Sequence, residues 1–163
     1  MTFVTVKVSK RKVDTKKIKE GTVRVGWFSN VRYSDGVSVA QVARWNEFGT
    51  WNIPARPFMT KVAHKAKGGF VSQLKSNYAI ALRNNEDTMK VLDFAGAEMR
   101  NNIQEQIDMT LSPRNSPVTI YGGWITTKTG KHIKIEGKGF DKPLYDTGFM
   151  YNSVTWQTEE VFK

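Results

Sequence analysis

Residues near both ends of the chain alternate between apolar and polar types. Residues 4–8 are Val-Thr-Val-Lys-Val, and β-branched and aromatic residues are frequent in 22–28 and again in 153–161. Alternation with a period of two is typical of a strand that buries one face. We therefore expect strands near the N-terminus and at the C-terminus, with the polar residues 9–20 as a basic arm or loop between the first two.

Two consecutive segments carry apolar residues at helical spacing. The first begins after Ser38, a residue type that favours the N-cap position, and ends at Gly49. The second begins at Pro57, which suits the first helical position because its missing N–H is not needed there. Its apolar stripe is interrupted by Gly68 and Gly69, where we expect the helix to bend or break.

The clearest helix is predicted for residues 86–108. Apolar side chains recur there at steps of three and four residues, and polar side chains fill the other positions. Glu86 and Asp87 are placed in its first turn, where a carboxylate interacts favourably with the helix dipole. The apolar positions are Leu92, Ala95, Gly96, Met99, Ile103 and Ile107.

A second hairpin and a short helix complete the predicted elements. Residues 124–127 and 131–135 flank a short turn, so 121–139 is interpreted as an inserted hairpin. Residues 146–148 are expected to open a short helix before the last strand. We predict a single α+β domain over residues 1–163, in which an antiparallel sheet of N-terminal and C-terminal strands packs on two longer helices.

The chain is strongly basic. It has 25 Lys and Arg residues against 15 Asp and Glu residues, a net charge of +10 at pH 7. Such a charge predicts attraction to an acidic partner that salt weakens. The arm suits an acidic protein partner or a solvated loop, and nucleic acid less well, because no aromatic residue for base stacking lies among its cations. These cations are Lys10, Arg11, Lys12, Lys16, Lys17 and Lys19.

Few residues offer catalytic or metal-binding chemistry. The chain has no cysteine, and His64 and His132 are far apart in sequence without a recognisable partner. Adjacent carboxylates such as Glu159 and Glu160 point to different faces of a strand. No run of about 18 apolar residues is present, so no membrane span is expected. We predict no catalytic residue, no metal ligand and no cofactor.

Two segments combine turn residues with aromatic and charged ones. In the first motif, residues 43–50 are Ala-Arg-Trp-Asn-Glu-Phe-Gly-Thr and residues 53–59 are Ile-Pro-Ala-Arg-Pro-Phe-Met. In the second, residues 142–150 are Lys-Pro-Leu-Tyr-Asp-Thr-Gly-Phe-Met, followed at 152–154 by Asn-Ser-Val. In this order and spacing the motifs resemble the tail-completion (head–tail joining, virion morphogenesis) proteins of long-tailed bacteriophages. The likeness covers about residues 23–156.

The resemblance implies a structural virion protein without enzymatic activity. Such proteins form a ring, often six-fold, in the phage neck, where they complete the tail and join it to the head connector. The implied partners are further copies of the chain and the adjoining connector and tail-tube proteins, and genome DNA passes through the lumen without sequence-specific binding. The implied location is the virion, after assembly in the host cytoplasm. The implied interface residues are Trp45, Asn46, Glu47, Phe48, Gly49, Pro54, Arg56, Pro57, Phe58, Asp146, Thr147 and Gly148.

Three alternatives stay open: a tail terminator, a minor tail protein that caps the tail tube and, from another class, a basic nucleic-acid-binding module. The inserted hairpin and the basic arm depart from the family pattern, so they bear on which neighbours are contacted. Arg56 is expected to pair with Glu47 or Asp146, because a guanidinium suits a bidentate carboxylate partner. The edges of the terminal strands and some of the five tryptophans are expected to form subunit contacts.

Overall fold

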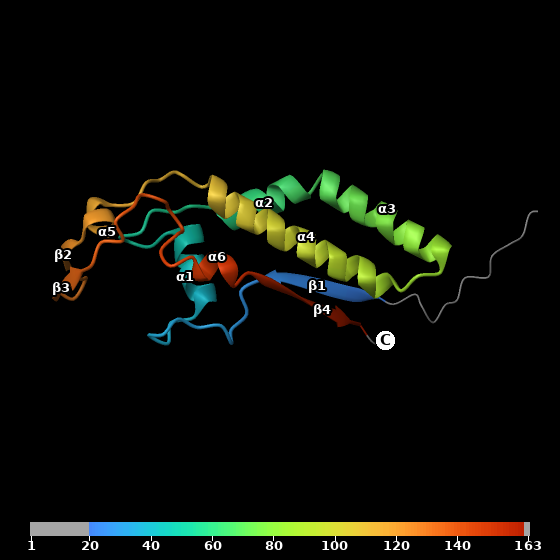
Figure 1. Cartoon of the computed structure of the whole chain (residues 1–163), viewed down its shortest axis with the longest axis horizontal. Coiled ribbons are helices and arrows are strands. Elements are labelled where there is room, and N and C mark those ends of the chain that lie inside the picture. The colour runs from blue at the N-terminus through green and yellow to red at the C-terminus, as the bar shows by residue number, and fades with distance from the viewer. Residues whose placement is uncertain (1–19, 162–163) are drawn as a thin grey trace, which may run out of the picture.

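The structure, a computed structural model, describes residues 20–161. Helices and antiparallel strands are both present, which confirms the predicted α+β class. Figure 1 shows an elongated molecule with a hairpin at one end and a two-stranded sheet along the longest helix in the other half. The elements are β1 (Gly21–Gly26), α1 (Val39–Phe48), α2 (Phe58–Ala66), α3 (Gly69–Asn84), α4 (Thr88–Met109), α5 (Pro117–Tyr121), β2 (Gly123–Thr126), β3 (His132–Ile135), α6 (Phe149–Asn152) and β4 (Thr155–Glu160).

The first and last strands of the described chain form one antiparallel sheet. β1 pairs with β4, with Val23 opposite Thr158. The long helix α4 packs on both strands, and α3 packs on another side of α4 (Figure 1). α4 approaches the sheet closely at Gly96, where a Cβ atom would lie 2.4 Å from Cδ1 of Trp156. Glycine at this position therefore sets the separation between helix and sheet. The strand expected at residues 4–8 lies outside the described residues.

The helix boundaries largely follow the predicted signals. The break expected at the two glycines is confirmed, because α2 ends at Ala66 and α3 begins at Gly69. The placement of Glu86 and Asp87 in the first turn of α4 is wrong. Oδ1 of Asp87 accepts a hydrogen bond from the backbone N–H of Met89 at 3.0 Å, so Asp87 is the N-cap and Glu86 precedes the helix. A short carboxylate reaches an unpaired N–H best from the cap position itself.

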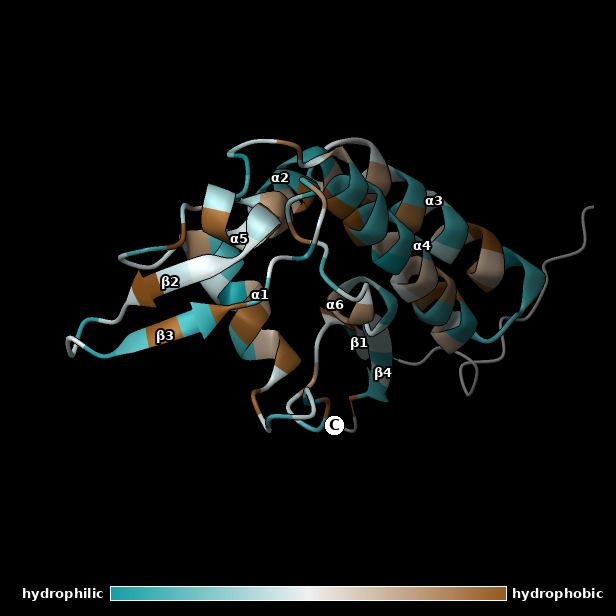
Figure 2. Ribbon diagram, turned by 60° about the vertical axis from the view of Figure 1, so that its left-hand side comes forward, coloured by the Kyte–Doolittle hydropathy of each residue, from teal (hydrophilic) through white to brown (hydrophobic). Residues whose placement is uncertain are grey.

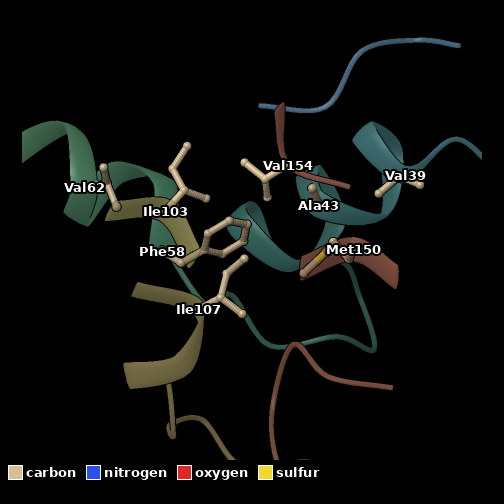
Figure 3. Close-up of a cluster of buried hydrophobic side chains, with 8 residues drawn as sticks. All are labelled: Val39, Ala43, Phe58, Val62, Ile103, Ile107, Met150 and Val154. Carbon is tan, nitrogen blue, oxygen red and sulfur yellow. The ribbon is translucent and has the colours of Figure 1, made fainter. Parts of the chain in front are cut away.

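A single buried cluster joins the two motifs to α4. Figure 3 shows these side chains converging from α1, α2, α4 and the segment around α6. Trp27 extends the cluster, with its ring 5.8 Å from that of Phe58 in an edge-on arrangement and its Nε1 donating to the carbonyl of Met150 at 2.7 Å. The cluster consists of Val39, Ala43, Phe58, Val62, Ile103, Ile107, Met150 and Val154.

The inserted hairpin is confirmed as a separate two-stranded sheet. β2 pairs with β3, with Ile125 opposite Ile133. Together with α5 it extends past α1, away from the β1–β4 sheet (Figure 2). The hairpin carries Trp124, whose side chain is 68% exposed. The core therefore gains little from this element, which is available for contacts with other molecules.

Candidate functional site

The first motif folds back on itself and ties α1 to α2. Gly49 ends α1 with a φ of 76°, a conformation that glycine adopts without strain. A Cβ atom there would lie 2.9 Å from the backbone N of Ala55, so glycine is also required by space. The backbone N–H of Arg56 then donates to the carbonyl of Asn46 at 2.7 Å. The loop is therefore held in one shape by its own backbone.

Glu47 is buried and caps the next helix. Its carboxylate accepts hydrogen bonds from the backbone N–H groups of Met59 at 2.8 Å and Thr60 at 2.9 Å, and from the Thr60 hydroxyl at 2.6 Å. These N–H groups belong to the first turn of α2, where no backbone carbonyl can reach them. A negative charge is also favoured at this end of a helix. Glu47 therefore fixes the angle between α1 and α2.

Arg56 is buried as well, but it does not pair with Glu47 or Asp146. Its Nε donates to the carbonyl of Pro113 at 2.7 Å and its Nη2 to the carbonyl of Arg114 at 3.0 Å. The expected ion pair is wrong because Glu47 is already occupied by the start of α2 and Arg56 points instead to the loop after α4. Burial lowers the pKa of Arg56, and nearby Asp141 offsets part of this effect.

The loop that Arg56 holds is also bound to the start of the second motif. Oδ2 of Asp141 accepts from Nε of Arg114 at 2.6 Å, and its Oδ1 accepts from the backbone N–H of Asn115 at 3.1 Å. These hydrogen bonds hold the pKa of Asp141 below its usual range. Nζ of Lys142 donates to Asp108 on α4 at 2.7 Å and lowers the pKa of that carboxyl. The two motifs are thus linked through residues 110–116.

The second motif packs Tyr145 inward and exposes Asp146 and Thr147. Tyr145 stacks against Tyr151 at 5.3 Å between ring centres, and burial together with Asp108 raises the pKa of Tyr145. Gly148, with a φ of 77°, occupies the N-cap position of α6. The hydroxyl of Thr147 accepts from the backbone N–H of Phe149 at 3.3 Å, so Thr147 supports the start of this helix. Asp146 is exposed to solvent.

A groove of about 440 Å³ separates the two motifs. Trp45 of α1 and Phe149 of α6 line it, together with Tyr33, Asp146 and Lys138. The Lys138 amine is not free to react, because it donates to the carbonyls of Lys142 and Tyr145. Among residues 20–161 no three His, Asp or Glu side chains are close enough to hold a metal ion. The groove offers aromatic surface with charged edges, which is a surface for contact.

Three aromatic side chains of α1 and the following loop point outward. Trp45 is 36% exposed, Phe48 is 72% exposed and Trp51 is 64% exposed. Phe48 borders an open hollow on the outer face of α1 together with Arg44. Exposed aromatic residues of this size on a rigid element are typical anchors of protein interfaces. We call these three residues the aromatic rim.

The predicted interface residues therefore divide into two groups. Buried or loop-forming positions hold the fold, whereas the aromatic rim and Asp146 face outward. Sequence reasoning missed the hydrogen bonds of Asp141 and Lys142, because single polar residues in loops give no periodic signal. The basic arm at 10–19 lies outside the described residues. The inward-facing positions are Asn46, Glu47, Gly49, Arg56 and Phe58, and Pro54 and Pro57 are exposed in the loop between α1 and α2.

Comparisons with family models, with curated proteins and with solved structures found no match. Within the described part of the chain, no helix is both long and apolar enough to cross a bilayer.

Proposed function

We propose that this chain is a structural subunit of a long-tailed phage, which forms a ring in the neck, completes the tail and joins it to the head connector. The proposal rests on the resemblance of the two motifs and on one observation. Segments separated by nearly a hundred residues of sequence share one buried cluster, in which Phe58 of the first motif and Met150 of the second both lie.

The architecture of this region favours assembly over catalysis. The polar groups of the motifs are used to fix loops, as Glu47 and Arg56 show, and they do not converge on a reacting position. The side chains left outside are large and aromatic. A rigid scaffold that displays aromatic side chains on loops and helix ends is suited to docking onto neighbouring proteins.

In a ring, different parts of this molecule would contact different neighbouring subunits. A closed ring needs two different contact surfaces on each subunit. The inserted hairpin lies at one end of the elongated molecule, and the β1–β4 sheet lies beneath α4 in the other half (Figure 1). The aromatic rim is exposed on α1 and the loop that follows it. Each subunit therefore has distinct surfaces for different neighbours.

The test is the phenotype of phage particles that lack the protein. We expect DNA-filled heads beside finished, unattached tails of normal length in electron micrographs. Overlong tail tubes would instead assign the chain to tail termination, and normal joined particles would contradict a role in the neck. A tight duplex-DNA affinity that falls steeply with salt would favour the basic nucleic-acid-binding module.

A further inference from the structure

The groove between the two motifs is acidic, although the protein as a whole is basic. Among the described residues that line it, three are carboxylates and Lys138 is the only cation. The ammonium of Lys138 is already held by the backbone carbonyls of Lys142 and Tyr145. The chain has a net charge of +10, so the side chains that line the groove reverse the charge of the rest. The carboxylates are Asp35, Glu136 and Asp146.

These carboxylates are available to a cation from outside. Glu136 and Asp146 are exposed, and neither forms a hydrogen bond or an ion pair within residues 20–161. Oδ1 of Asp35 accepts from the backbone N–H of Val37 at 2.9 Å, which fixes this carboxylate in place. Burial raises the pKa of Tyr33, and Asp146 and Asp35 raise it further, so both carboxylates lie near the same ring. A cation beside Tyr33 would therefore meet two negative charges.

Aromatic rings form the walls of the groove beside the carboxylates. Tyr33 and Phe149 contact each other edge-on, with 5.2 Å between ring centres, and Trp45 lines the groove from α1. A Lys or Arg side chain is attracted to the face of such a ring, most strongly to that of tryptophan. Its methylene groups also pack on apolar surface while the charged end stays near polar groups. The groove therefore suits a cationic side chain.

The turn of the inserted hairpin presents the complementary charge. Residues 123–135 contain three lysines and no carboxylate. Lys128 and Lys131 lie in the turn and are exposed, and neither forms an ion pair in the described part of the chain. The backbone N–H of Gly130 donates to the carbonyl of Thr127 at 2.9 Å, and that of Thr127 to the carbonyl of Lys131 at 2.8 Å. The turn therefore holds its two lysines on a defined backbone.

We propose that the hairpin turn of one copy docks in the groove of a second copy, with Lys128 and Lys131 beside the groove carboxylates. The proposal rests on the proposed function, because it specifies how subunits of the ring join. Trp124 lies opposite Lys134 across the two strands, so both belong to the same exposed face of the hairpin. Trp124 supplies apolar area to this contact, and Lys134 supplies a third positive charge.

The geometry of the hairpin favours a second copy over the groove of the same copy. Ile135 and Glu136, at the base of the hairpin, line the groove. Figure 2 shows β2 and β3 extending from this base, with the turn that joins them at the far end. β3 has four residues and spans about 13 Å, so the lysines of the turn are carried away from their own groove. A neighbouring groove is free of this restriction.

The contact also has the symmetry that a ring requires. The donor is the hairpin turn and the acceptor is the groove between the motifs, so the two surfaces are different. Contacts between different surfaces join copies head to tail and close into a ring when the rotation allows it. Each subunit then gives its hairpin to one neighbour and receives the hairpin of the other.

Cross-linking of the unmodified protein tests the contact directly. Unlabelled and isotope-labelled protein are mixed and treated with a carbodiimide, which joins an amine and a contacting carboxylate as an amide. We expect mass spectrometry to find Lys128 or Lys131 joined to Glu136 or Asp146, with one labelled and one unlabelled peptide in each pair. Pairs formed only within one copy, or no pair between the turn and the groove, overturn the proposal.

Variants of reversed charge give an independent measurement. One carries Lys128→Glu with Lys131→Glu, and the other carries Glu136→Lys with Asp146→Lys. In sedimentation velocity each alone needs a concentration about tenfold or more higher to self-associate, because like charges now meet in the contact. An equal mixture of the two restores association, since every hairpin then meets a groove of opposite charge.

The matched control changes the net charge equally at another surface. Lys61→Glu with Lys75→Glu alters two exposed lysines, one on α2 and one on α3, and does not weaken association. Circular dichroism verifies that each variant is folded. Loss of association in this control as well would show that net charge alone is responsible, which overturns the proposal. A mixture of the two reversed variants that fails to associate overturns it too.

Two further outcomes separate this inference from the neck role. A protein that stays monomeric at every concentration overturns the contact between copies. A groove variant that self-associates normally but lowers the yield of joined particles assigns the groove to a cationic segment of another neck protein, which also overturns it. Neither result removes the chain from the neck, which the phenotype of particles lacking the protein decides separately.

Discussion

Buried polar residues fix the geometry of the first motif. Glu47 and Arg56 lie within ten residues of each other, and each satisfies backbone groups on another element rather than its neighbour. A buried polar group costs stability unless it is hydrogen-bonded, so these side chains are tied to one arrangement of α1, α2 and the loop after α4. At the scale of single residues, the buried polar side chains of the first motif therefore fix the angle between α1 and α2.

Glu47→Ala is expected to destabilise the protein by about 2 kcal/mol, because it leaves partly buried backbone N–H groups in the first turn of α2 without acceptors. Urea unfolding measures the change. Glu105→Ala is the matched control, since its ion pair with Lys65 at 3.7 Å is exposed and contributes little. Equal stability of the two variants would contradict the capping role of Glu47.

The protonation of Asp141 is expected to make the free energy of unfolding depend on pH. Its hydrogen bonds from Arg114 and Asn115 lower its pKa in the folded state, so it stabilises the protein above the ordinary aspartate pKa and loses this effect as the pH falls below about 4. Asp141→Asn is therefore less stable at neutral pH, and its stability falls less on acidification. Asp108→Asn changes in the same direction, because Lys142 lowers the pKa of Asp108. Unfolding curves measured from pH 6 to pH 3 that remain parallel to the parent would refute both assignments.

At the scale of elements, a glycine permits the close contact between α4 and the β1–β4 sheet. A methyl group at position 96 would meet Trp156 at 2.4 Å and Val23 at 2.8 Å. Helix α4 would have to move away from the sheet to accommodate this methyl group. The position of the helix over β4 depends on this contact.

Gly96→Ala is expected to destabilise the protein by about 1–3 kcal/mol through overpacking, even though alanine favours a helix by about 1 kcal/mol. Gly69→Ala, where no atom lies within 4 Å of the added methyl, is the control and is neutral or slightly stabilising. Thermal unfolding of both variants provides the comparison. A stabilised Gly96→Ala protein would show that the helix does not lie this close to the sheet.

Local signals in the sequence predicted the elements better than their contacts. The ends of α1, the break between α2 and α3, the hairpin and the last strand follow from caps, glycines and alternation, all of which act over a few residues. The partners of Arg56 did not follow, because Pro113 and Arg114 are brought to it by the path of α4 and contribute only backbone carbonyls. Any residue type has such a carbonyl, so no pattern in the sequence marks it.

At the scale of the whole molecule, the stable core and the exposed aromatic residues are separated. The buried cluster joins α1, α2, α4 and the segment around α6 (Figure 3), whereas the hairpin extends beyond it (Figure 1) and the aromatic rim is exposed to solvent. Substitutions in the two regions should therefore have different consequences. Changes in the core affect folding, and changes at the periphery affect assembly.

Trp124→Ala is expected to leave the free energy of unfolding within about 0.5 kcal/mol of the parent, because the side chain is largely exposed. It should lower the yield of joined particles, since an exposed aromatic residue on the hairpin is an anchor for a neighbouring protein. Trp27→Ala is the contrasting variant, because Trp27 packs on Phe58 and should cost several kcal/mol in stability. Normal particle yield with Trp124→Ala would exclude the hairpin from the joining contacts.

The most direct test of the central claim is a reconstruction of the neck of the intact phage particle at a resolution that traces side chains. We expect a closed ring between the head connector and the tail tube, with density that fits residues 20–161 in every subunit. Infectious particles in which this chain is absent, or in which the ring at that position is built from another protein, would contradict the claim.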